Sequence, residues 1–128
     1  MKLLLDTHIF IWWVDEPEKL STAAISALED EANELLLSVA SVWEMQIKLQ
    51  LGKLKLSLPL KELVKNQQDT NDLRVSPVAL THVLALDSLP FHHKDPFDRL
   101  LIAQCMAEGL TIVTVDSQFS AYSVKLLQ

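Results

Sequence analysis

Short apolar runs recur along the chain and are separated by longer segments of mixed polarity. Five of these runs have the length and the Leu, Val and Ile content of strands: residues 3–5, 34–38, 73–76, 110–116 and 123–127. The first is three consecutive leucines, which suits a strand covered on both of its faces. We therefore expect buried strands in a parallel sheet.

Helical patterns fill the intervals between these runs. Their boundaries are marked by capping and stop residues, which are Ser21 for one helix, Ser41 and Gly52 for another, Pro59 and Pro77 for two more, and Asp95, Pro96 and Gly109 for the strongest. Strand and helix thus alternate, which predicts an α/β fold with helices on both faces of the sheet. No repeat or linker interrupts residues 1–128, so we expect one domain.

The composition is typical of a compact soluble protein. Hydrophobic residues make up 49% of the 128 residues and only two glycines are present, which excludes disordered and low-complexity classes. The single cysteine, Cys105, lies in an apolar helical pattern, and we expect an inert buried thiol in a reducing compartment. No signal segment or membrane-spanning apolar run is present, so we expect a cytoplasmic protein without a membrane association.

The net charge of −6 argues against broad electrostatic wrapping of nucleic acid, but the charges are unevenly distributed. Acidic residues dominate positions 15–34, whereas five lysines fall within positions 48–65. The lysine-rich segment could attract phosphates. Two ordinary solvated helix faces are the plainer alternative.

Two aspartates stand where predicted strands end. Asp6 comes directly after residues 3–5, and Asp116 ends the run 110–116. Sites of open parallel sheets lie beyond the carboxyl ends of the strands, so both positions favour a functional site. Either aspartate alone could instead cap a helix or close a turn, but the occurrence of both favours chemistry.

Further acids lie near the starts of predicted helices. Glu44, in SVWEMQIK, is one turn into the helix after the second strand, which returns it to the strand ends; an exposed position or a capping-box acid for Ser41 is the alternative. In HKDPFDRLLIAQ, Asp95 is a natural N-cap and Asp98 falls at the inward-pointing third position. We assign the chemistry to Asp98 and a supporting role to Asp95, which remains a second candidate ligand.

The blocks LLLDTH, SVWEMQIK, DPFDRLLIAQ and TIVTVDSQF, in this order, resemble the PIN-domain nucleases, and specifically the VapC-type toxins of bacterial toxin-antitoxin pairs. The resemblance covers nearly the whole chain. It implies a five-stranded parallel sheet in the order 3-2-1-4-5, which places the first and fourth strands side by side. It also implies that Asp6, Glu44, Asp98 and Asp116 hold metal, that RNA is the substrate, and that the partners are a cognate antitoxin and a second copy of the chain.

Four carboxylates at one point repel one another. Six pairs about 4 Å apart at an effective dielectric of about 20 would cost roughly 25 kcal/mol, more than the stability of a small domain. Oxygen ligands without clustered Cys or His select Mg²⁺ or Mn²⁺ rather than zinc, and we expect one or two ions. Such ions activate water for attack on phosphorus, so together with the resemblance we expect a metal-dependent endoribonuclease.

Neighbours of these acids receive secondary assignments. Thr7 is expected to orient the adjacent aspartate or a bound water. His8 could contact a phosphate, with a hydrogen bond at the helix start as the alternative. Lys48 and Arg99 are candidates for the RNA backbone, although Lys48 could instead pair with the glutamate four residues earlier. No histidine is assigned to the metal.

Other fold families with a strand-end aspartate fit less well. A receiver domain would need an acidic pair after its first strand and a lysine at the end of its last, and both are missing. A phosphatase with a D-x-D motif would need an aspartate where His8 stands. The remaining alternative is a catalytically inactive PIN-like module that binds protein or RNA.

Overall fold

In the computed structural model, which describes residues 1–128, five strands form one parallel sheet in the order β3-β2-β1-β4-β5. The strands are β1 Lys2–Leu5, β2 Glu34–Ser38, β3 Arg74–Ser76, β4 Thr111–Val113 and β5 Lys125–Leu127. β1 lies at the centre, where Leu5 is aligned with Leu37 of β2 on one side and with Val113 of β4 on the other. The predicted fold class and strand order are confirmed.

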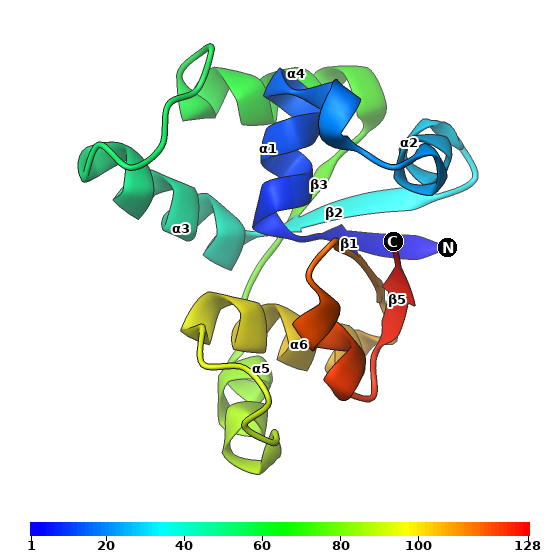
Figure 1. Ribbon diagram of the computed structural model, residues 1–128, viewed down its shortest axis with the longest axis vertical. Coiled ribbons are helices and arrows are strands. Elements are labelled where there is room, and N and C mark those ends of the chain that lie inside the picture. Colours follow the sequence, from blue (N-terminus) through cyan, green and yellow to red (C-terminus); the bar gives the residue numbers. More distant parts are fainter.

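Helices cover both faces of the sheet (Figure 1). One layer contains α1 Thr7–Asp15, α2 Thr22–Glu29, α3 Val39–Gln50 and α4 Leu60–Asn71, and the other contains α5 Leu80–Ala85 and α6 Pro96–Glu108. Short 3₁₀ turns lie at Pro17–Lys19, Leu86–Ser88 and Ser117–Ala121. None of the helices combines the length and the apolar character that crossing a bilayer requires.

Successive side chains of a strand point to opposite faces of the sheet, so they contribute to two apolar clusters, one on each face. Leu3 and Leu5 of β1 belong to the cluster that packs under α1 and α2, whereas Leu4 belongs to the cluster that packs against α6. Cys105 of α6 lies in the second cluster and is buried, and this burial raises the pKa of its thiol to about 12. The cysteine is therefore an unreactive core residue.

α3 begins earlier than the sequence predicted. Its N-cap is Ser38, the last residue of β2, whose hydroxyl accepts the N–H of Ala40 at 3.1 Å and donates to the side chain of Gln104 at 2.6 Å. Ser41, the predicted cap, is instead buried in the first turn. Because β2 passes into α3 without a linker, the start of this helix lies at the carboxyl edge of the sheet.

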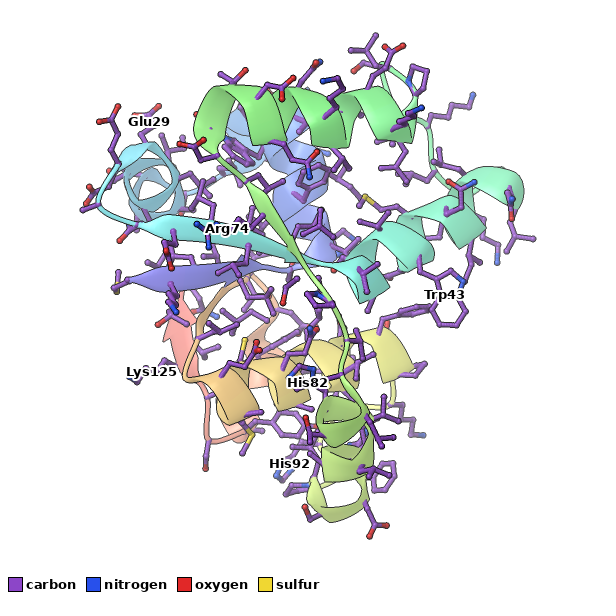
Figure 2. The ribbon with its side chains drawn as sticks, turned by 180° about the vertical axis from the view of Figure 1, so that it is seen from behind. Glu29, Trp43, Arg74, His82, His92 and Lys125 are labelled. Carbon is purple, nitrogen blue, oxygen red and sulfur yellow. The ribbon has the colours of Figure 1, made fainter.

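α5 begins at Leu80, later than the predicted start at Pro77. The helix start is fixed by His82, whose Nδ1 accepts the backbone N–H of Ala79 at 2.9 Å. His82 is buried where α5 meets α6, and its Nε2 lies 3.7 Å from the carboxylate of Glu108 (Figure 2). The histidine therefore joins the two helices of this layer.

Candidate active site

The ends of β1 and β4 bring the first two acids together. β4 stops at Val113, so it is shorter than the predicted run, and the N–H of Asp6 donates to the Val113 carbonyl at 3.0 Å. The Thr114 hydroxyl donates to Oδ2 of Asp6 at 2.5 Å and accepts the N–H of Asp116 at 3.1 Å. One hydroxyl thus connects both acids, and the T-x-D pattern is the signal that could have identified Thr114.

Asp6 has two roles at once. Its Oδ1 accepts the N–H of Ile9 at 2.9 Å and caps α1, which is the structural role that the sequence offered as an alternative. The side chain is only 4% exposed. Burial raises the pKa of Asp6, although the hydrogen bonds from Thr114 and Ile9 act in the opposite direction. A buried carboxylate of this kind lacks enough positive charge around it.

Glu44 lies in α3 with its side chain turned inward. Its Oε1 accepts the hydroxyl of Thr7 at 2.7 Å, and its Oε2 pairs with Lys48 at 2.8 Å. Because Glu44 is 4% exposed and Ser38 caps the helix, neither an exposed position nor a capping box describes it. Thr7 therefore orients Glu44 instead of Asp6.

Asp98 and Asp95 have different roles at the start of α6. Oδ1 of Asp95 caps the helix by accepting the N–H groups of Phe97 at 2.8 Å and Asp98 at 3.3 Å. The pKa of Asp98 is raised to about 7, first by burial and then by the charge of Asp95, and the charges of Asp6 and Glu44 add to this effect. Asp98 thus shares one electrostatic environment with Asp6, directly after β1, and Glu44 of α3, which supports its assignment over Asp95.

His93 is a member of the cluster that sequence reasoning missed. Its Nε2 lies 3.0 Å from Oδ2 of Asp98 and 3.1 Å from Oδ2 of Asp116, and its side chain is 13% exposed. The residue sits in a segment without regular secondary structure between Leu89 and Asp95. No periodicity or ligand spacing predicts the direction of such a side chain.

Arg99 has a different role from the RNA contact predicted for it. The residue is 6% exposed, and its guanidinium donates to the carbonyls of Pro90 at 2.8 Å and Leu89 at 3.2 Å. It also lies 4.0 Å from the ring centre of Phe91. These contacts occupy the guanidinium in holding the segment before α6, so Arg99 is a structural residue.

The other two basic candidates remain near the acids. Lys48 forms the ordinary helical ion pair with Glu44 that the sequence offered as an alternative, and its side chain is 38% exposed. His8 is exposed in the first turn of α1, with its ring 6.1 Å from that of Trp12. His8 also lowers the pKa of Asp6 through its charge, which places the imidazole near the site.

The donor set fits a hard divalent cation. Ligand atoms of His93, Asp98 and Asp116 lie within 4.8 Å of one another. Asp6 is linked to Asp116 through Thr114, and the charges of Asp6 and Glu44 both act on Asp98. Burial raises the pKa of both Asp6 and Asp98 even though the nearby charges of His8 and His93 act in the opposite direction, and a divalent cation would supply the positive charge that these carboxylates still lack. Oxygen donors of this type suit Mg²⁺ or Mn²⁺.

Comparisons with known proteins agree with this geometry. Residues 3–125 match the PIN domain family model. The chain is 33% identical over 122 residues to Ribonuclease VapC22 of Mycobacterium tuberculosis, which covers 94% of this chain and 91% of that protein.

Solved structures of low sequence identity share the fold. The VapBC2 structure from Rickettsia felis, bound to a DNA fragment from its promoter, superposes with a TM-score of 0.76 at 17% identity and full coverage of both chains. FitAcB from Neisseria gonorrhoeae gives a TM-score of 0.67 at 18% identity, with 98% of this chain and 96% of that chain covered. These structures agree with the sheet order, and the family model and the ribonuclease relative show that the chain belongs to the PIN-domain family and is of the VapC type, as its motifs predicted.

Proposed function

We propose that this protein is a metal-dependent endoribonuclease that acts as the toxin of a toxin-antitoxin pair. The observation that carries the proposal is the convergence of Asp6, Glu44, Asp98 and Asp116 at one edge of the sheet, from four separate segments of the chain. The ribonuclease relative at 33% identity supports RNA as the substrate. Such a protein would act in the cytoplasm, where its substrate is.

One or two Mg²⁺ or Mn²⁺ ions would be held by these four carboxylates. A divalent ion supplies charge neutralisation at a scissile phosphate and an activated water for its hydrolysis. The chain itself contributes the orientation of its ligands, through Thr7 on Glu44 and Thr114 on Asp6.

The proposed hydrolysis also needs a group that accepts a proton from the attacking water. We assign this role to Asp98, whose side chain is more exposed than those of Asp6 and Glu44. Asp6 and Glu44 are more deeply buried and serve as fixed anionic ligands. No side chain is needed as a nucleophile.

A groove next to Glu44 supports the approach of RNA. It has a volume of about 390 Å³ and lies between α3 and the start of α6, and Lys48, Lys94 and Phe97 line it. Trp43 projects from α3 at the same place, is 62% exposed and packs edge-on against Phe97 with ring centres 5.4 Å apart (Figure 2). Lysines beside the exposed ring of Trp43 fit a single-stranded nucleic acid, because the cations bind phosphates and the ring stacks on a base.

Two apolar surfaces support the proposed protein partners. A groove of about 500 Å³ between α3 and α4 is lined by Val42, Leu60 and Val64, and it suits an apolar segment of an antitoxin. The antitoxin partner is proposed from the VapC-type family match of this chain. On α5, Leu80 and Leu84 are 72% and 62% exposed, which favours a homodimer that covers this helix.

The test is cleavage of a purified cellular RNA pool, with Mn²⁺ or with EDTA. We expect fragments with Mn²⁺ only, and we expect Glu44→Gln to abolish them because the amide cannot serve as an anionic ligand. Glu62→Gln is the matched control, since Glu62 is an exposed acid in the first turn of α4. Equal cleavage in EDTA would refute the metal assignment, and intact RNA in every condition would favour the inactive binding module.

A further inference from the structure

His93 contacts two of the four acids, yet the chemistry proposed above assigns it no role. Its Nε2 is almost equidistant from Asp98 Oδ2 and Asp116 Oδ2, at 3.0 and 3.1 Å. These two carboxylates come from α6 and from the turn after β4, and no hydrogen bond joins them directly. The imidazole is therefore the group that bridges the two elements.

The hydrogen bond at the other ring nitrogen, Nδ1, determines which nitrogen of His93 carries the ring proton. The backbone N–H of Asp95 donates to Nδ1 at 3.2 Å, so Nδ1 must present a lone pair. The ring proton then belongs on Nε2, where two carboxylate oxygens are placed to accept it. The hydrogen-bond network thus assigns His93 as a donor to both acids.

The segment that carries His93 is held on several sides. Arg99 donates to the carbonyls of Leu89 and Pro90, and the Tyr122 hydroxyl accepts the backbone N–H of His92 at 3.1 Å. The His93 ring itself packs edge-on against the ring of Phe119, which belongs to the second apolar cluster, with ring centres 6.0 Å apart. A donor held in this way can fix the positions of the carboxylates that accept its hydrogen bonds.

We propose that His93 is a positioning residue of the metal site, which holds Asp98 and Asp116 together through one bifurcated Nε2–H donor. The inference rests on the proposed metal-dependent function and adds to it an orienting group outside the carboxylate set. The donor offsets the repulsion between the two carboxylates and limits their rotation, so the site is arranged before an ion arrives.

The same geometry argues against His93 as a direct ligand. A ligand role would require a lone pair on Nε2, which would move the ring proton to Nδ1 and set it against the N–H of Asp95. That hydrogen bond would be lost, and a backbone donor at the cap of α6 would lose its partner. His93 therefore acts on the site through the carboxylates.

The test compares two substitutions in the full-length protein. His93→Gln keeps an amide N–H near the position of Nε2, whereas His93→Asn is too short to place a donor there. The matched control is His92→Asn at the exposed neighbouring histidine, whose backbone contact to Tyr122 does not depend on its side chain. Binding of Mn²⁺ and Mg²⁺ to each protein is measured by calorimetry, without RNA.

We expect His93→Asn to weaken Mn²⁺ binding by about 10- to 100-fold, the usual effect of losing a hydrogen bond to a metal ligand. His93→Gln should restore most of the affinity, and the ratio of Mn²⁺ to Mg²⁺ affinity should stay as in the wild type. Unchanged or tighter binding by His93→Asn would overturn the inference, and so would a collapse of the Mn²⁺ preference, which would make His93 a ligand.

Nitrogen-15 NMR of the metal-free protein provides a second readout. The His93 signals, identified by their absence in the Asn variant, should show a protonated Nε2 and an unprotonated Nδ1. The reverse tautomer would contradict the proposed donor. If the wild type binds Mn²⁺ and the His93 variants bind it equally, only this inference fails; if the wild type binds no divalent ion, the proposed function fails with it.

Discussion

Replacement of Asp98 by Asn should stabilise the metal-free protein, and the gain should depend on pH. Burial, together with the charges of Asp95, Asp6 and Glu44, raises the pKa of Asp98 from 3.8 to about 7. The folded protein therefore keeps a proton that the unfolded chain releases between about pH 4 and 7. The free energy of unfolding of the wild type falls as the pH rises through this interval and is then constant.

The size of the effect follows from the same values. A tenfold change in proton affinity corresponds to about 1.4 kcal/mol, so the raised pKa of Asp98 sets an upper limit of about 4 kcal/mol at pH 8. Its side chain is 19% exposed, and solvent screening reduces this to an expected gain of about 2 kcal/mol. At pH 4 the two proteins should have nearly equal stability.

Urea unfolding followed by circular dichroism, in EDTA at pH 4, 6 and 8, measures this difference. Glu62→Gln removes one exposed acidic charge from α4 and should follow the wild-type pH dependence. Addition of Mn²⁺ at pH 8 should stabilise the wild type by about 2.7 kcal/mol at a hundred times its Kd, and Asp98→Asn by much less. A variant that is no more stable than the wild type at pH 8 would refute the electrostatic reasoning.

Three further predictions concern single side chains. Asp6→Asn should keep the cap of α1, because the Asn carbonyl still accepts the N–H of Ile9, so the variant should melt no lower than the wild type in EDTA. It should lose most of the stabilisation by Mn²⁺, and a full Mn²⁺ response in melting curves would remove Asp6 from the site. Arg99→Met leaves the carbonyls of Leu89 and Pro90 without their side-chain donor and should lower the free energy of unfolding by about 3 kcal/mol in urea titrations, whereas a loss below about 1 kcal/mol would contradict the structural role. Cys105, with a pKa of about 12, should react with thiol reagents at pH 8 only after unfolding, and rapid labelling of the native protein would show that the helix opens.

Local sequence patterns were enough to predict most acids of the candidate site, because these acids lie where strands end or helices begin. Asp6 follows a strand and caps α1, and Asp95 caps α6 directly before Pro96, so both roles depend on residues three or fewer positions away. The boundaries were less predictable. Ser38 and Ser41 are both competent caps, and the strand that ends at Ser38 decided between them.

The α/β alternation and the family could be predicted without a structure, since the hydrophobic period, the helix stops and the ordered acidic blocks are all properties of the linear chain. The contacts that hold those acids, in contrast, arise only when the chain has folded. Thr114 contacts Asp6, which is 108 positions away in the sequence, and His93 contacts Asp116, which is 23 positions away. Arg99 donates to the carbonyls of the preceding loop. Such contacts depend on side-chain directions after the sheet has formed, and neither residue type nor spacing specifies those directions.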